Sequence, residues 1–253
     1  NKLVVAGVIL NQEIKNLGNF GQRVINQPKK TVVIAGGSKV SDKIAVLKQF
    51  VHTEVKAIFI GGKMVNAFLL AQNSKSKMKT FGISDIPGNL VSSSDEANHN
   101  LVNEVSLAAE ILDFAINKKV DLIFPQDYKC VNEFKSPKYF IKTKPNFEKE
   151  LQLDLGPKTI ESFKNTILSD GIENIIWNGP LGAYDHPTNP DYIEGSLELA
   201  QLLFEEALTN PSFSVVIGGG DSAAILNKIG TNQIKNLIRR CIEKQLAAPI
   251  NRN

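Results

Sequence analysis

The stretch Thr31-Val32-Val33-Ile34-Ala35-Gly36-Gly37 joins an apolar, β-branched run to a pair of glycines. The same order recurs at residues 57–62, 174–179 and 213–220. These runs are apolar on both faces, which is typical of parallel strands covered by helices on both sides. The pattern predicts an α/β fold, a doubly wound (Rossmann-like) parallel sheet with helices on both faces, arranged as a three-layer sandwich. In such a sheet the ligand lies at the carboxyl ends of the strands, where glycine lets backbone N–H groups approach a phosphate.

Composition limits the class of protein and its partners. The 253 residues carry a net charge of +3 without a basic stripe, so no nucleic acid partner is expected. Cys130 and Cys241 are the only cysteines and the three histidines are scattered, which favours neither a disulfide framework nor a zinc site and predicts a reducing, cytoplasmic location. The apolar run 3–10 is far shorter than the roughly 20 residues of a membrane span and lacks the flanks of a signal peptide, so no membrane association is expected.

The order of the elements predicts one domain. The chain starts at Asn1 rather than methionine, so we expect it to be part of something longer. Residues 1–18 are expected to form a linker or hinge helix that ends at a glycine, and residues 19–253 the α/β domain. Residues 73–95 have the composition of a loop. We expect strands at 31–35, 57–60, 121–124, 139–143, 173–177 and 213–217, and helices at 38–50, 64–72, 97–118, 157–168, 192–208 and 232–246.

The sequence Gly36-Gly37-Ser38-Lys39-Val40-Ser41-Asp42-Lys43 places two lysines one helical turn apart at the predicted start of a helix. The positive end of a helix dipole disfavours cations there, unless an anion such as phosphate lies between the backbone amides and the ammonium groups. The spacing of a Walker A loop occurs nowhere in the chain. The alternative is that both lysines are solvated surface residues after a tight turn.

The sequence Gly218-Gly219-Gly220-Asp221-Ser222 repeats this arrangement at another strand end, but with an acidic residue where the helix begins. Asp221 can be an ordinary N-cap. It can also be a magnesium ligand, because a carboxylate that faces bound phosphates holds the ion that neutralises them.

Residues 177–185, Trp-Asn-Gly-Pro-Leu-Gly-Ala-Tyr-Asp, contain too many helix and strand breakers to be regular. They end in Asp185, a carboxylate able to accept hydrogen bonds from ribose hydroxyls. As an isolated motif this segment is merely a turn. We expect His186, beside Pro187, to be a surface residue rather than a catalyst of proton transfer.

Together these segments resemble the carboxy-terminal, nucleotide-binding domain of the phosphoglycerate kinase family. The resemblance extends from about residue 4 to residue 230, and several motifs in the right order are more specific than any one of them. Besides the three motifs above it rests on Ala6-Gly7-Val8-Ile9-Leu10, Ile60-Gly61-Gly62-Lys63-Met64, Asn132-Glu133-Phe134 and Leu153-Asp154-Leu155-Gly156-Pro157-Lys158-Thr159.

The resemblance implies roles for individual residues. Lys39 resembles the lysine that follows the transferring phosphoryl group and Lys43 the one that binds nucleotide phosphates, while Asp221 would bind Mg²⁺. Catalytic roles fall on Lys39, Gly219 and Asp221. The implied nucleotide-binding residues are Gly36, Gly37, Ser38, Lys43, Gly61, Gly62, Phe134, Leu153, Asn178, Gly179, Pro180, Ala183, Asp185, Gly219, Gly220, Asp221 and Ser222, of which Leu153, Pro180 and Ala183 would contact the base.

The implied reaction is a step of glycolysis, transfer of the γ-phosphoryl group of ATP to the carboxylate of 3-phosphoglycerate and the reverse, with Mg²⁺ accompanying ATP or ADP. The family's substrate-binding amino-terminal domain is absent, so we expect the isolated chain to be inactive and the full-length protein to be a monomer. The alternative is a degenerate nucleotide-binding module without turnover. A dinucleotide oxidoreductase is disfavoured, because no G-x-G-x-x-G follows the first strand.

Departures from the family pattern qualify the resemblance. Family members usually carry a small residue at Lys63, glycine at Gln152 and glutamate at Asp185, so the fit of the nucleotide is expected to differ. After Gly230 the family's carboxy-terminal glycine-rich turn is missing from the sequence.

Overall fold

The computed structural model describes residues 8–76, 81–87, 90, 92–136, 138–143, 145, 149–186 and 190–222, with the backbone alone for residues 8–16, 190 and 191. Its central sheet has the order β3-β2-β1-β7-β8, and every pairing is parallel. The predicted doubly wound parallel sheet is therefore confirmed. The strands are β1 (Thr31–Ala35), β2 (Ala57–Ile60), β3 (Asp121–Ile123), β7 (Asn174–Asn178) and β8 (Ser214–Gly218).

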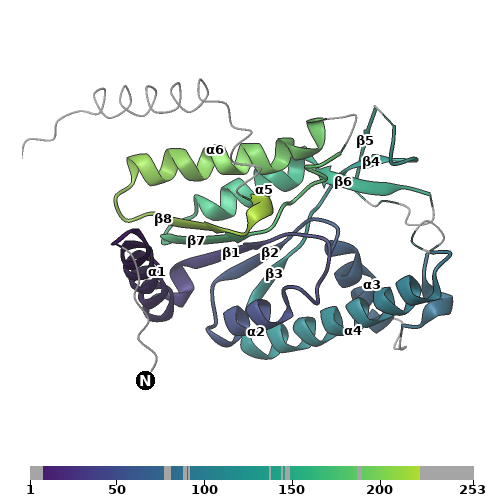
Figure 1. Cartoon of the computed structure of the whole chain (residues 1–253), viewed down its shortest axis with the longest axis horizontal. Helices are drawn as coiled ribbons and strands as arrows, with labels where there is room; N and C mark the ends of the chain where they lie inside the picture. The colour runs from purple at the N-terminus through teal and green to yellow at the C-terminus, as the bar shows by residue number, and fades with distance from the viewer. Residues whose placement is uncertain are drawn as a thin grey trace, which may run out of the picture.

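Helices cover both faces of this sheet (Figure 1). Alternate residues of a strand point to opposite faces, so Val33 packs toward one set of helices and Val32 toward the other. Across the second face, the rings of Phe59 and Phe163 stack with centroids 4.0 Å apart. The first face is covered by α2 (Ile44–His52), α3 (Val65–Ser76) and α4 (Asp95–Lys118), and the second by α5 (Pro157–Ile167) and α6 (Glu194–Thr209).

A second, antiparallel sheet lies beside the helical layers, in the order β5-β4-β6. It consists of β4 (Tyr128–Val131), β5 (Phe140–Lys142) and β6 (Leu151–Leu155), of which the sequence predicted only the segment 139–143. Lys129 and Asp154 interrupt the apolar pattern of β4 and β6, so neither reads as a buried strand. They are cross-strand partners, and their side chains are only 5% and 0% exposed.

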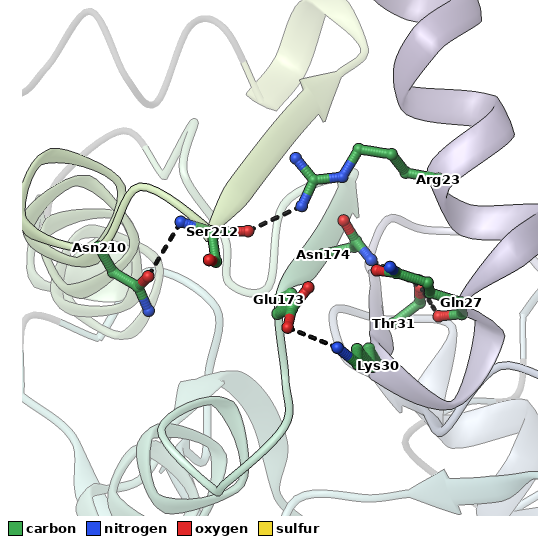
Figure 2. Close-up of polar contacts among 8 residues, drawn as sticks. All are labelled: Arg23, Gln27, Lys30, Thr31, Glu173, Asn174, Asn210 and Ser212. Atoms are coloured by element: carbon green, nitrogen blue, oxygen red, sulfur yellow. Dashed lines mark hydrogen bonds and ion pairs between the residues drawn. The ribbon is translucent and has the colours of Figure 1, made fainter.

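The first helix, α1 (Val8–Asn26), continues through Gly18 and Gly21 instead of ending at Gly18 as predicted. A glycine inside a helix costs only about 1 kcal/mol relative to alanine, which tertiary contacts offset. Arg23 supplies such contacts: its guanidinium donates to Ser214 Oγ and to the carbonyl of Ser212, both at 2.7 Å. Together with the Lys30–Glu173 ion pair at 2.6 Å, these contacts fasten α1 and the start of β1 to the amino ends of β7 and β8 (Figure 2).

Two more predicted elements differ from the structure. The helix expected at 38–50 begins only at Ile44, because the Glu104 carboxylate accepts hydrogen bonds from the backbone N–H groups of Val40 and Ser41 and holds this segment as a turn. The loop expected at 73–95 contains the end of α3. The remaining short helices are η1 (Pro28–Lys30), η2 (Ile83–Asp85) and η4 (Pro190–Ile193).

The predicted helix 232–246, with Cys241, lies outside the described residues, as do residues 1–7 of the predicted hinge helix. Cys130 is buried and is a free thiol. Among the helices that the structure describes, none combines the length and apolar character needed to cross a membrane.

Candidate functional site

The loops after β1, β2 and β7 cross one another at the carboxyl end of the central sheet. The N–H of Gly36 donates to the carbonyl of Asn178, and that of Gly37 to the carbonyl of Pro180, both at 2.9 Å. A Cβ at Gly36 would lie 2.1 Å from the oxygen of Pro180, and one at Gly179 only 2.2 Å from the oxygen of Gly36. Gly179 also has a φ of +94°, which favours glycine. Gly36 and Gly179 therefore allow the two loops to come into contact. From the sequence both glycines were assigned to nucleotide binding, and this structural role was not predicted.

A cavity of about 500 Å³ opens beside this crossing, between the ends of the parallel strands and β6. Its position at the carboxyl ends, where the strand order changes direction between β1 and β7, is the expected ligand position of a doubly wound sheet. The sequence-predicted site residues that line it are Gly37, Ser38, Gly62, Phe134, Leu153, Pro180, Ala183, Asp185 and Asp221.

A second cluster joins the loops after β1, β7 and β8, and it contains Lys43, Asn178, Gly179, Gly219 and Ser222. Lys43 Nζ donates a hydrogen bond to Asn178 Oδ1. Gly219 has a φ of +95° and lies close to the same amide oxygen. A Cβ added at Gly219 would be 3.7 Å from Asn178 Oδ1 and 3.8 Å from Ser222 Oγ. The Ser222 hydroxyl accepts a hydrogen bond from the N–H of Gly179 at 2.8 Å. A cation, an amide, a hydroxyl and an open glycine backbone thus meet in one place, a donor set that suits phosphate oxygens.

Four predicted residues lie outside both groups. Gly36 and Gly61 are buried behind the cavity wall, where a Cβ at Gly61 would lie 2.5 Å from Leu181 Cδ2. Lys39 and Gly220 are exposed, and Lys39 has no hydrogen bond or ion pair with any residue that the structure describes. Because α2 starts at Ile44, only Lys43 stands at a helix start, and the predicted pair of cations on one helical turn is wrong for Lys39.

Asp221 stands at the mouth of the cavity, where its Oδ1 accepts a hydrogen bond of 2.8 Å from the Tyr184 hydroxyl. This hydrogen bond is the main reason that the pKa of Tyr184 is raised, and partial burial and the charges of Asp221 and Asp185 add to it. Among the described residues no group of three or more His, Cys, Asp or Glu side chains could enclose a metal ion. A single exposed carboxylate is nevertheless the kind of ligand that Mg²⁺ uses when substrate phosphates and water supply its other oxygens.

Asp154 forms part of the cavity wall. It was not among the site residues predicted from the sequence. Burial raises its pKa to about 7, although the N–H of Gly195 donates to its Oδ2 at 3.1 Å and Lys129 Nζ lies 3.8 Å away. Burial by itself lowers the pKa of Lys129, but the hydrogen bond to Glu194 and the charge of Asp154 raise it more, so this ammonium group stays charged. The network ties β4 and β6 to the start of α6, and only the register of two unpredicted strands could have revealed it.

His186 is buried at 9% exposure rather than on the surface as expected. Its ring packs between Phe134 and Tyr192, with centroids 4.6 Å and 4.8 Å away, and its Nε2 is hydrogen-bonded to the carbonyl of Phe134. These contacts hold Phe134, which is 46% exposed, against the cavity.

Comparison with known proteins gives this site its context. The family model for phosphoglycerate kinase matches residues 1–238. The phosphoglycerate kinases of Lactobacillus delbrueckii subsp. lactis and Thermosipho africanus are each 34% identical to the chain, over 230 and 232 residues. These alignments cover 90% and 89% of this chain but only 48% and 50% of those proteins, so the chain spans about half their length.

Solved structures agree with the sequence comparison. Phosphoglycerate kinase from Coxiella burnetii superimposes with a TM-score of 0.65 at 25% identity, over 89% of this chain and 51% of that one. The fold is also shared with the Pyrococcus horikoshii enzyme, at a TM-score of 0.63 and 22% identity, over 88% of this chain and 49% of that one. From its sequence, its fold and its family match, the chain belongs to the phosphoglycerate kinase family.

Proposed function

We propose that this chain is the ATP- and ADP-binding half of a phosphoglycerate kinase, which transfers the γ-phosphoryl group of ATP to the carboxylate of 3-phosphoglycerate and catalyses the reverse reaction. The observation that carries the proposal is the convergence of Lys43, Asn178, Gly219 and Ser222 beside the cavity. This cluster is polar and cationic, and the cavity next to it is lined largely by apolar side chains. A nucleotide has the same two halves.

The base and ribose would occupy the cavity. Leu153, Pro180 and Ala183 supply apolar surface for a planar ring, and Phe134 closes one side. Asp185 is exposed at the cavity edge, where its carboxylate can accept hydrogen bonds from ribose hydroxyls. Asp185 is shorter than the glutamate usual at this position. The loop that carries it is tied to β6 by a hydrogen bond of 2.7 Å from the Ala183 N–H to the Leu153 carbonyl.

The phosphates would lie over the second cluster. Lys43 would exchange its contact with Asn178 for phosphate oxygens, and the backbone around Gly219 is open enough for close approach. Lys39, which is exposed and has no described partner, can move with the phosphoryl group as it transfers. Phosphoryl transfer depends chiefly on positioning and on stabilising charge, and these groups supply both.

Asp221 is the residue that would hold Mg²⁺, in keeping with its exposed carboxylate at the junction of cavity and cluster. When bound, the ion supplies positive charge that neutralises the phosphate oxygens. The 3-phosphoglycerate site is proposed to belong to the other half of a longer protein, since the chain spans about half the length of its relatives. We place that protein in the cytoplasm, as a monomer acting in glycolysis.

Two features favour a second candidate, a nucleotide-binding module without turnover. Lys63 and Gln152 both line the cavity, where the family usually has a small residue and glycine. Longer side chains there reduce the space for a base. Such a module would bind a nucleotide weakly and transfer nothing.

Calorimetric titration of the chain with Mg·ADP and Mg·ATP tests the proposal. We expect a dissociation constant on the order of 10 μM to 1 mM, because the phosphate cluster is present but no second domain closes over it. No heat with either nucleotide at millimolar concentration would overturn the nucleotide site. A chimera that adds the amino-terminal half of the Lactobacillus delbrueckii relative then separates the two candidates: turnover of 3-phosphoglycerate supports the kinase, and binding without turnover supports the module.

A further inference from the structure

Tyr184 and Asp221 come from different loops and meet at the cavity mouth. Tyr184 follows β7 and Asp221 follows β8, and the phenol donates to Asp221 Oδ1 at 2.8 Å. Both residues line the cavity. Neither the turn-like sequence around Tyr184 nor the glycine-rich motif around Asp221 predicts this contact.

The residue next to each partner is hydrogen-bonded to another part of the fold. The Tyr184 N–H donates to the carbonyl of Gly182 at 2.9 Å, and the next anchor, Ala183 N–H to the Leu153 carbonyl, ties the loop to β6. On the other side, Ser222 is held by the N–H of Gly179 at 2.8 Å. The Tyr184–Asp221 hydrogen bond therefore joins two loops that are each tied by a hydrogen bond to another part of the fold.

An exposed aspartate otherwise rotates among several conformers. Restricting the carboxylate to the one conformer that binds an ion therefore costs side-chain entropy. A donor on Oδ1 selects one conformer in advance. Among the described residues, Oδ2 accepts no hydrogen bond and so remains available for a cation. Hydrogen bonds to the second atom of a metal-ligating group commonly orient it in this way.

We propose that Tyr184 is a positioning residue that orients the Asp221 carboxylate for the Mg²⁺ of a bound Mg·nucleotide. This inference rests on the proposed function, because it takes Asp221 as the ligand of the ion. The role is specific: the phenol acts on the metal through Asp221 and not on the nucleotide directly. Removing the hydroxyl should therefore matter only when Mg²⁺ is present.

The test is Tyr184→Phe, which deletes one oxygen atom and keeps the ring. ADP affinity is measured by calorimetry on the whole chain in excess Mg²⁺ and again in EDTA. We expect affinity to fall about three- to tenfold in Mg²⁺, the size of one hydrogen bond to a charged group at a partly exposed position, and to be unchanged in EDTA. Tyr139→Phe, an exposed tyrosine outside the cavity, is the matched control and should change neither value.

Tyr184→Phe is also measured in the Asp221→Asn background. If Tyr184 acts through Asp221, Tyr184→Phe should have no further effect in that background. An equal loss in Mg²⁺ and EDTA, an unchanged affinity in Mg²⁺, or tighter binding in Mg²⁺ would each overturn the inference, the last because it would mean that the phenol competes with the ion. If wild type binds ADP but Asp221→Asn keeps its full magnesium dependence, the metal role of Asp221 is wrong. If wild type binds no ADP, the proposed function itself fails.

Discussion

Lys43 Nζ donates a hydrogen bond to Asn178 Oδ1, although 135 residues separate them in the chain. The contact bridges the loop after β1 and the end of β7, the two neighbouring strands at which the sheet changes direction. An ammonium group held by an amide oxygen, with no described carboxylate paired to it, can exchange that partner for an anion.

Lys43→Ala should lower ADP affinity about 10- to 100-fold, the size of a hydrogen bond between a cation and a phosphate. The free energy of unfolding should change by less than about 1 kcal/mol, because Lys43 is only half-buried and is not part of the hydrophobic core. Calorimetry and urea unfolding of the same preparations measure both. Unchanged ADP affinity would mean that Lys43 is a surface residue.

Lys39→Ala should act on turnover rather than on binding. In the chimera with a relative's amino-terminal half, kcat should fall about 10²- to 10³-fold, as when one preorganised charge-stabilising group is lost. ADP affinity of the chain should hardly change, since Lys39 is exposed and outside the cavity. Lys43→Ala in the same chimera is the contrasting variant and should mainly raise KM. A Lys39→Ala enzyme with wild-type kcat would contradict the role.

Glu104→Ala should destabilise the loop that carries both lysines. The carboxylate accepts the N–H groups of Val40 and Ser41, and the variant leaves both without that acceptor, at an expected cost of about 1 to 3 kcal/mol. Glu110→Ala is the matched control on the same helix, because Glu110 makes an exposed ion pair with Lys48 that contributes less than about 1 kcal/mol. Urea unfolding compares the two, and equal costs would mean that the loop does not depend on Glu104.

Gly36→Ala and Gly220→Ala should differ in stability, because Gly36 lies at the loop crossing and the backbone of Gly220 is open. At Gly36 a Cβ would lie 2.1 Å from a backbone oxygen, so we expect a loss of more than about 2 kcal/mol in the free energy of unfolding. At Gly220 nothing lies within 4 Å of the added carbon, so stability should change by less than about 1 kcal/mol. Thermal unfolding measures both, and a fully stable Gly36→Ala protein would show that the loop crossing can relax.

Asp154 should make stability depend on pH. Burial raises the pKa of Asp154 to about 7 in the folded protein, above the 3.8 of an unperturbed aspartate, so the folded state holds the proton more tightly than the unfolded state does. The contribution of the Asp154 proton to the free energy of unfolding is therefore complete below about pH 4 and is lost as pH rises through 7. Between pH 5 and pH 8, wild type should lose about 2 to 3 kcal/mol relative to Asp154→Asn. Urea unfolding of both proteins at each pH gives this difference, and parallel curves would refute it.

Local sequence was sufficient wherever a signal lies within one segment. The apolar runs at β1, β2, β7 and β8 identified parallel strands because a strand buried on both faces has few polar positions. β4 and β6 were missed because Lys129 and Asp154 break that pattern. Their burial is tolerated because the two face each other across the strands and because Glu194 and the N–H of Gly195, at the start of α6, supply further partners. The start of α2 was misplaced for a similar reason, since Glu104 lies some 60 residues away from the turn that it holds.

The sequence by itself determined the class of sheet, the family and the residue types at the site, because these follow from periodicity, from glycine at strand ends and from the order of motifs. Only the tertiary structure decided which glycines support the loop crossing and which leave the backbone open, and that His186 is buried. It alone paired Lys43 with Asn178 and Tyr184 with Asp221. The physical reason is that strand order and register bring distant loops together, and no single segment of the chain carries that information.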